Sequence, residues 1–391
     1  MCYNKTILIW IIFQLGPLGA LFAQGNWQNF TTENTIMTDN QINDILIIDG
    51  VKWIGTNWGL YTYDNTSWID YTDVLPHPLV NSISIDQEGN IYVCTLSGIA
   101  IYDGVSWETI TSQNSIITNH VNEVIFDDNN TAYVGTIDGL FKMNNDDISI
   151  ILDSSSLEPN FINVRCLTFK GDSLCIGTVN GGLGYLYNDS ISWYNTNNGL
   201  IDNTSTDLLV DKENLWITSP YGGLISHLLD ANFLIFNTSF FSDWPSNSLN
   251  TVYKDDELFY VGSSGGGFFS FSYDFGVQNT NTFNTKNSGL INDYVLCIEK
   301  DELGYWIGTE GGLVYWTDIS SIYEPYQVIK PVNNIFDNVL TFHFKDDINI
   351  YSLDGKLIFS DNNISSINLS FLNKGVYISE FNNSRSILIL H

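Results

Sequence analysis

The stretch WIGTNWGLY at residues 53–61 recurs, with variation, seven times along this chain of 391 residues. Each copy carries an aromatic or aliphatic residue, then Ile or Val, then Thr or Ser as an anchor, and ends in a Gly-aliphatic turn. Successive anchors are 39, 41, 42, 41, 44 and 46 residues apart, at Thr56, Thr95, Thr136, Thr178, Ser219, Ser263 and Thr309. A repeat of this length is typical of a four-stranded propeller blade. The sequence therefore predicts an all-β, seven-bladed propeller.

Two further segments recur in each copy and predict how the ring closes. An apolar segment, such as INDILIID at residues 42–49, precedes each signature and is expected to be the innermost strand. An aromatic-led segment, such as SWIDY at residues 67–71, is expected to be the outer strand. The earliest such segment, NWQNF at residues 26–30, precedes the first inner strand, and nothing comparable immediately follows the seventh signature. We therefore expect this N-terminal strand to complete the last blade and leave no open sheet edge.

Composition agrees with this architecture. The chain is 44% apolar and 14% aromatic, which suits sheets that stack face to face, and long amphipathic helical patterns are absent. A glycine follows each anchor, for example Gly59 and, in the sixth copy, Gly266. We expect this glycine to make a tight turn with positive φ.

The first 23 residues have the pattern of an export signal. Lys5 is followed by an apolar stretch over residues 7–15 and by the small residues Ala20 and Ala23. The mature chain is then expected to begin at Gln24. A membrane anchor is the alternative, but the stretch is interrupted, and no other run approaches the roughly 18 apolar residues that a span needs. We expect no integral membrane segment in the mature chain.

The composition changes after Asp318. Residues 318–333 are expected to be a linker, and residues 334–391 contain short strands with hairpin turns at 353–356 and 372–375, which predicts a small β-sandwich. This part resembles the C-terminal sorting domain of type IX secretion cargo in Bacteroidetes. The matching residues are Ile350, Tyr351, Leu353, Gly355, Lys356, Leu369, Leu372, Gly375, Val376 and Tyr377. The resemblance implies recognition by the type IX secretion machinery and delivery, via the periplasm, to the cell surface or the medium.

The blades, over residues 24–317, resemble two-component-regulator propeller repeats. The family pattern joins an inner strand to a WiGTxxGLy signature, which the copies at residues 53–61 and 306–315 follow most closely. In that family the repeats often form the periplasmic sensor of hybrid histidine kinases. This chain has one ring and no kinase pattern, so the resemblance implies a fold and a habit of ligand recognition rather than signalling.

The charge balance excludes some partners. The formal net charge is −30, from 44 acidic and 14 basic residues, which argues against binding to nucleic acid or to anionic lipid. Many acidic residues fall in the turns after the inner strands, where Asp ordinarily caps the backbone. No DxDxDG loop occurs, so we expect no cofactor, with Ca²⁺ at these turns as the alternative.

Two apparent chemical signals are weak. The four cysteines of the mature chain, Cys94, Cys166, Cys175 and Cys297, have no CxxC spacing, and we expect buried free thiols. Cys166 and Cys175 belong to one blade but are expected to lie diagonally across a hairpin. The string at residues 262–266 matches GxSxG, yet it falls on a strand-to-strand turn, whereas a nucleophile elbow needs a strand-to-helix turn.

Candidate ligand-binding residues gather at one face of the ring. His77 and His120 enter inner strands of successive blades and are either acid/base or metal ligands or, as we favour, ordinary loop histidines. Arg165 takes a slot that Asn81, Asn122 and Asn250 fill in other blades; it is expected to bind an anionic group or to form a structural ion pair. The loops between second and third strands add Trp58, Asp138, Asn180, Tyr221 and Glu310.

Aromatic rings beside amides and carboxylates suit sugars, because apolar sugar faces stack on the rings while hydroxyls bond to the polar groups. The sequence therefore favours a secreted, non-catalytic binding or scaffold module with glycans as the expected ligand, and we assign no catalytic or metal-binding residue. Two alternatives stay open. One is an extracellular polysaccharide lyase or glycosidase with its site at the channel mouth, and the other is an adhesin that binds protein.

Overall fold

The computed structural model describes residues 25–390, with gaps at 114, 116–119, 145–146, 154–162, 228–232, 243, 274–275, 318–338, 353–355, 369–374 and 382–383. The predicted export signal, the predicted linker and most residues of the two C-terminal turns lie outside the described residues. The chain divides into two compact units, which meet at Thr317 and Asp318 in the sequence.

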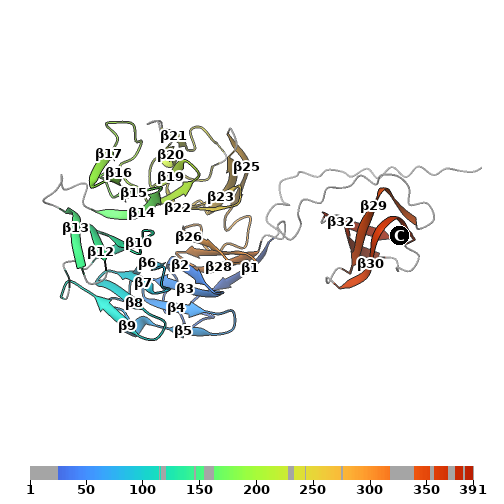
Figure 1. The fold of residues 1–391 in the computed structure, drawn as a ribbon, viewed down its shortest axis with the longest axis horizontal. Coiled ribbons are helices and arrows are strands. Elements are labelled where there is room, and N and C mark those ends of the chain that lie inside the picture. Colours follow the sequence, from blue (N-terminus) through green and yellow to red (C-terminus); the bar gives the residue numbers. More distant parts are fainter. Residues whose placement is uncertain are drawn as a thin grey trace, which may run out of the picture. The chain divides into compact units, whose positions relative to one another are not determined.

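The first unit is a ring of seven four-stranded antiparallel sheets, which confirms the predicted propeller (Figure 1). In blades 1 to 6 the strands run outward in sequence order. Blades 1 to 3 are β2 (Ile42–Ile48), β3 (Val51–Thr56), β4 (Gly59–Tyr63) and β5 (Trp68–Asp70); β6 (Val80–Ile85), β7 (Ile91–Thr95), β8 (Gly98–Tyr102) and β9 (Trp107–Ile110); and β10 (Val121–Phe126), β11 (Ala132–Thr136), β12 (Gly139–Asn144) and β13 (Asp147–Asp153). A short 3-10 helix, Thr72–Val74, follows β5.

Blades 4 to 6 repeat this order. They are β14 (Val164–Lys170), β15 (Ser173–Thr178), β16 (Leu183–Tyr187) and β17 (Ser190–Tyr194); β18 (Asp207–Asp211), β19 (Asn214–Ser219), β20 (Gly223–His227) and β21 (Phe233–Phe236); and β22 (Leu249–Asp255), β23 (Leu258–Ser263), β24 (Phe268–Tyr273) and β25 (Val277–Phe283).

The seventh blade closes the ring with strands from both ends of the propeller. It consists of β26 (Val295–Lys300), β27 (Tyr305–Thr309), β28 (Gly312–Thr317) and, at its outer edge, β1 (Asn26–Phe30). β1 pairs antiparallel with β28, and Trp27 lies opposite Trp316 with ring centroids 5.4 Å apart. The predicted closure by the N-terminal strand is therefore confirmed.

A buried lysine also joins the first blade to the last. The side chain of Lys52 in β3 is fully buried, and its Nζ lies 3.7 Å from a carboxylate oxygen of Asp301 and 4.8 Å from the Trp306 ring centre. Nζ donates hydrogen bonds to the Gly50 carbonyl and to Asn65 Oδ1. Burial lowers the pKa of Lys52, and the charge of Asp301 opposes this shift. The ammonium group thus has partners from blade 1 and blade 7.

The anchor residue explains why each signature contains Thr or Ser. Thr56 Oγ1 donates to the Gly59 carbonyl at 3.0 Å and accepts from the Trp58 backbone N–H. The same donor bond forms from the anchors of every blade except the fifth, where Ser219 accepts from Gly222 N–H. The buried hydroxyl therefore fixes the turn that carries Trp58, Asp138 and their equivalents. In blades 4 to 6 this turn is one residue longer, and in the sixth blade the glycines with positive φ are Gly265 and Gly267 and not the predicted Gly266.

The glycine before the anchor lets neighbouring blades approach. A Cβ on Gly55 would lie 2.5 Å from Val80 Cγ1, and one on Gly262 would lie 2.8 Å from Val295 Cγ1. Both valines begin the inner strand of the next blade. Small residues here allow apolar clusters to fill the space between sheets, as in the cluster of Trp216, Phe259 and Phe271 between blades 5 and 6.

The second unit is a four-stranded antiparallel sheet in the order β30-β29-β31-β32, made of β29 (Val339–Tyr351), β30 (Leu357–Asn368), β31 (Gly375–Phe381) and β32 (Ser384–Leu390). The unit is all-β, as predicted, and its described strands form one hydrogen-bonded sheet. β29 has 13 residues, and register shifts interrupt its pairing with β30. Such irregularities let long strands bend within a sheet.

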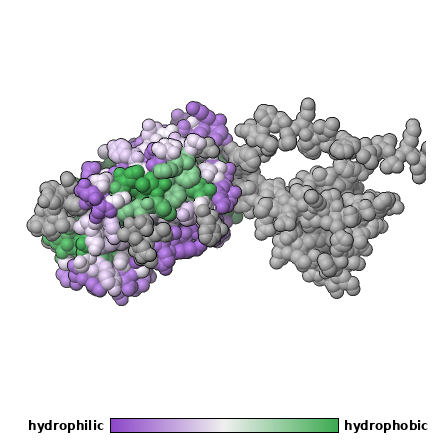
Figure 2. Space-filling view, turned by 90° about the horizontal axis from the view of Figure 1, so that it is seen from above, coloured by the Kyte–Doolittle hydropathy of each residue, from purple (hydrophilic) through white to green (hydrophobic). Residues whose placement is uncertain are grey.

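The outer surface of the propeller is not uniformly polar. Figure 2 looks from the side on which blades 4 and 5 lie in Figure 1, and apolar residues gather in the middle of that face. Leu234 of β21 and Phe240 after it are among the exposed apolar side chains of blade 5. In the part of the chain that the structure describes, no helix is long and apolar enough to cross a membrane.

Candidate functional site

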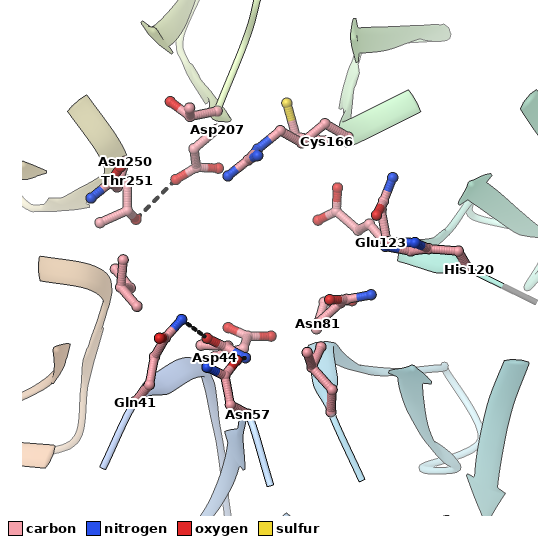
Figure 3. A pocket seen from close by; sticks show the side chains of 17 residues that line it. Gln41, Asp44, Asn57, Asn81, His120, Glu123, Cys166, Asp207, Asn250 and Thr251 are labelled. Atoms are coloured by element: carbon pink, nitrogen blue, oxygen red, sulfur yellow. Dashed lines mark hydrogen bonds between the residues drawn. The ribbon is translucent and has the colours of Figure 1, made fainter. Parts of the chain in front are cut away.

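A polar cavity of about 450 Å³ lies where the inner strands begin, at one mouth of the central channel (Figure 3). Every blade contributes at least one residue. The lining consists of Gln41, Asn43, Asp44, Asn57, Leu79, Asn81, Ser82, His120, Asn122, Glu123, Arg165, Cys166, Thr206, Asp207, Asn250, Thr251 and Leu296. Amides, hydroxyls, carboxyls, one imidazole and one guanidinium therefore converge on the same space.

In blades 1, 2, 3, 4 and 6 a shift of strand register places two consecutive residues of the inner strand at the cavity. Between Ile42 and Asp44 the pairing of β2 with β3 skips Asn43, and the same irregularity occurs in blades 2, 3, 4, 6 and 7. Regular strand alternation would send Asn43 and Asp44 to opposite faces, but the bulge lets both line the cavity.

In five blades the first of these two residues forms a hydrogen bond to the next blade. Asn81 Nδ2 donates to the Val121 carbonyl at 2.6 Å, and Asn122 Nδ2 donates to the Val164 carbonyl at 2.7 Å. Equivalent bonds run from Asn43 to Val80, from Thr206 to Leu249 and from Asn250 to Val295. We call this hydrogen bond the blade clasp. At least one N–H of each of these amide nitrogens is thus already used, whereas Oδ1 of Asn81 and Asn122 has no hydrogen bond within the described residues.

The second residue of the pair is a carboxylate in blades 1, 3 and 5. Asp44 accepts from Ile83 N–H at 2.6 Å, Glu123 accepts from Leu167 N–H, and Asp207 accepts from Val252 N–H at 2.9 Å. Each carboxylate therefore pairs with a backbone amide of the following blade, next to the bulge. None of these three residues was among the candidates predicted from the sequence.

Burial in the channel wall shifts the titration of these groups. It raises the pKa of Asp44 to about 7, although two backbone N–H groups act in the opposite direction. Burial also raises the pKa of Glu123 well above its usual range, and the charge of Asp207 adds to this. Burial raises the pKa of Asp207 as well. On β26, burial raises the pKa of Glu299 to about 8. The wall is thus less negative near neutral pH than its composition suggests.

Arg165 occupies the clasp position of blade 4 but makes no clasp. Arg165 is exposed and lines the cavity. Within the described residues its guanidinium group forms no hydrogen bond and no ion pair. Its charge lowers the pKa values of Asp207 and Cys166, but less strongly than burial raises them.

His120 is the other predicted residue that lines the cavity. Burial lowers its pKa, the charge of Asp138 opposes this, and His77 adds slightly to it. His77 and Asp138 therefore lie close enough to interact with His120, but neither lines the cavity. His77 Nδ1 accepts from Leu79 N–H at 3.0 Å, which holds that ring in the loop before β6.

The remaining predicted residues lie on the expected loops, outside the cavity. Trp58 and Tyr221 are 58% and 83% exposed, and both belong to loops between the second and third strands of their blades. Asn180 Oδ1 accepts from Thr204 Oγ1, and Glu310 is exposed. The structure thus brings Arg165 and His120 together with the clasp residues and leaves the two aromatic rings on the surrounding surface.

Other candidate chemistry finds no support in the described residues. The four cysteines are buried and free, as predicted, and Cys175 pairs with Thr168 while Cys166 pairs with Gly177, so the two are diagonal. Burial raises the pKa of each thiol, which disfavours the reactive thiolate. In the described part of the chain no group of three or more His, Cys, Asp or Glu side chains could hold a metal ion.

The acidic turns act on their own backbone. Asp86 Oδ1 accepts from Glu88 and Asn90 N–H, and Asp301 Oδ1 accepts from Leu303 and Gly304 N–H. These bonds agree with the interpretation of Asp as a turn cap.

Residues 330–389 match the model of the secretion system C-terminal sorting domain. The C-terminal unit is a type IX sorting domain. A protein with this sorting domain is recognised by the type IX machinery and secreted to the cell surface or the extracellular space. No match is found among curated proteins.

Several solved structures share the propeller fold. The extracellular domain of a hybrid two-component system from B. thetaiotaomicron is 17% identical, with a TM-score of 0.66 over 94% of this chain and 57% of that one. Virginiamycin B lyase from Staphylococcus aureus is 11% identical, with a TM-score of 0.60 over 75% of this chain and 100% of the lyase. PorZ, a surface component of the type IX secretion system of Porphyromonas gingivalis, is 13% identical, with a TM-score of 0.52 over 90% of this chain and 59% of PorZ. At these identities the likeness concerns the fold alone, and the chain spans little more than half of the first and third proteins.

Proposed function

We propose that this secreted propeller is a non-catalytic binding module whose ligand is an extracellular glycan, held at the mouth of the central channel. The observation that carries the proposal is the polar cavity, in which amide oxygens, hydroxyls, His120 and Arg165 converge. Sugar hydroxyls need such a mixture of donors and acceptors. Its volume of about 450 Å³ suits a small ligand or the end of a longer one.

The exposed aromatic rings extend the proposed site beyond the cavity. Trp58 directly follows the cavity-lining Asn57, and Tyr221 lies on the equivalent loop of blade 5. Large exposed aromatic residues stack against the apolar faces of sugar rings, while their own rigidity keeps the entropic cost of binding low. Two such rings on the channel-mouth face favour a ligand that reaches past the cavity.

A non-catalytic role agrees with the state of the wall carboxyl groups. Asp44, Glu123 and Asp207 each accept a hydrogen bond from a backbone amide of the next blade. Glycoside hydrolysis needs a pair of carboxyl groups that flank the scissile bond and are free to move protons. Groups committed to the ring itself fit that role poorly.

A glycan array with the mature full-length chain tests the proposal. We expect binding to a subset of glycans, a loss of about tenfold or more in affinity with Trp58→Ala, and no change with Val105→Ala. Val105 is 89% exposed and follows β8, away from the cavity lining. Unchanged glycan affinity in Trp58→Ala would contradict the placement of the ligand, and an array without any hit would move the proposal to a protein partner.

A lyase or glycosidase is the second candidate, because His120 lines the cavity and feels the charge of Asp138. A histidine near a carboxylate can serve as a general base. Incubation of the array hits with the protein would reveal this function as new chain ends. Turnover that disappears in His120→Ala would replace the binding module by an enzyme.

A further inference from the structure

We infer that the cavity receives the terminal sugar of a glycan that carries a carboxylate, and that the Arg165 guanidinium pairs with this group. The inference rests on the glycan-binding function proposed above and specifies its ligand. It depends on the position of Arg165, on its lack of protein partners and on the size and charge of the surroundings.

Arg165 lies at the position from which most blades form the clasp, but it does not form this hydrogen bond. Four other blades carry Asn at this position and a fifth carries Thr206, and all five donate the clasp to the next blade. Arg165 makes no such bond, and neither does Leu296, which takes this position in blade 7. The junction between blades 4 and 5 therefore lacks a contact that five of the seven junctions have, and Arg165 is the one charged residue at this position. A departure from a repeated local rule without a compensating contact is typical of functional positions.

The guanidinium is available to a ligand. It is the one Arg or Lys side chain that lines the cavity, and within the described residues its N–H groups have no hydrogen bond and no carboxylate oxygen within 4.0 Å. The charge of Arg165 lowers the pKa of Asp207, but the Asp207 carboxylate already accepts hydrogen bonds from Val252 N–H and Thr251 Oγ1. Arginine binds carboxylates through two parallel hydrogen bonds, and removal from water strengthens such a pair.

Size and charge limit the ligand to one acidic sugar at a chain end. A cavity of about 450 Å³ lies toward the lower end of the usual range for small-ligand sites, about 300–1,000 Å³. The net charge of −30 repels a polyanion. At physiological salt this repulsion fades beyond about 8 Å, so a single carboxylate beside Arg165 is tolerated where a continuous acidic chain is not. The Oδ1 atoms of Asn81 and Asn122 would accept hydrogen bonds from the hydroxyl groups of the sugar.

The test compares two variants of the mature full-length protein. Arg165→Asn removes the guanidinium and installs the residue that makes the clasp elsewhere, so we expect its melting temperature to be unchanged or higher. Lys170→Asn removes one positive charge from the same strand, β14, outside the cavity. The probes are trisaccharides that end in glucuronate, galacturonate, mannuronate or N-acetylneuraminate, each with its neutral counterpart, measured by titration calorimetry.

We expect one acidic trisaccharide to bind wild type and Lys170→Asn about 10- to 100-fold more tightly than its neutral counterpart, with this preference abolished in Arg165→Asn. Equal binding of acidic and neutral probes to wild type would overturn the inference while leaving the glycan-binding function in place. An acidic preference that survives Arg165→Asn would also overturn it. Failure of every probe to bind would count against both the inference and the proposed function.

Discussion

In several inner strands two consecutive residues line the cavity, and only the first of the two was predictable from the sequence. The slot of Asn81, Asn122 and Arg165 was predictable, because the same position recurs in each repeat. Asp44 and Glu123 were not identified, since strand alternation places them on the opposite face from their neighbours. In blades 1 and 3 the bulge brings both members of the pair to the cavity. Because this break in register leaves no mark in the repeat pattern, the sequence did not indicate that these carboxylates line the cavity.

Glu299 provides a residue-level prediction for stability against pH. Burial raises its pKa from 4.5 to about 8, so the folded state favours the protonated form more than the unfolded state does. The favourable contribution is complete below about pH 4.5 and is lost as pH rises through about 8. We expect the melting temperature of wild type to fall between pH 6 and pH 9, and to fall by several degrees less in Glu299→Gln. Identical pH dependence in both proteins would show that Glu299 does not titrate with folding.

The clasp gives a second prediction for single residues. Asn122→Ala deletes the hydrogen bond to the Val164 carbonyl and leaves that carbonyl without this donor. We expect the free energy of unfolding to fall by about 1–2 kcal/mol in a urea titration. Asn129→Ala, in the exposed turn after β10, is the control and should stay within about 0.5 kcal/mol of wild type. A loss no larger than that of the control would mean that the blade junction does not depend on the clasp.

At the scale of elements, the order of strands in each blade was predictable from the repeat. The closure by β1 was predictable because the chain begins with an outer-strand segment and not with an inner strand. The aromatic-led segment comes before the first inner strand and is missing after the seventh signature, so one strand from the N-terminal end completes the last blade. The C-terminal unit was less predictable. The sequence predicts several short strands there, whereas the structure has two long ones, β29 of 13 residues and β30 of 12, whose pairing is interrupted by register shifts.

Trp27 tests the closure strand. Its ring packs against Trp316 of blade 7 and lies 6.4 Å from Phe268 and Phe283 of blade 6, so β1 contributes to two blades. Because the side chain is only half-buried, we expect Trp27→Ala to cost about 2 kcal/mol, less than the about 3–5 kcal/mol of a fully buried Trp. Gln28→Ala, on the exposed side of the same strand, serves as the control. Equal unfolding midpoints for the two variants would argue that β1 does not close the ring.

At the scale of the whole molecule, secretion and the propeller are separate properties carried by separate units. The sorting domain directs the protein outward, and the ring supplies a polar cavity at one mouth of the channel. The large negative charge favours solubility outside the cell and opposes binding to nucleic acid. The family resemblance of both units was visible in the sequence, whereas the ligand depends on a few side chains that the repeat does not fix.

Deletion of residues 334–391 tests the division of labour. We expect the truncated protein to accumulate in the periplasm, because the sorting domain is what the type IX machinery recognises. Cell fractionation and immunoblotting of the medium, the cell surface and the periplasm would measure this. Normal delivery of the truncated protein to the surface would contradict the role of the tail.

The most direct measurement of the central claim is an experimental structure of the mature protein with its tightest-binding glycan. The account predicts a ring of seven blades, with β1 at the edge of the last one and a sugar residue in the cavity beside Arg165 and His120. Ligand density on the outer strands or at the opposite mouth of the channel, with this cavity filled only by water, would contradict it.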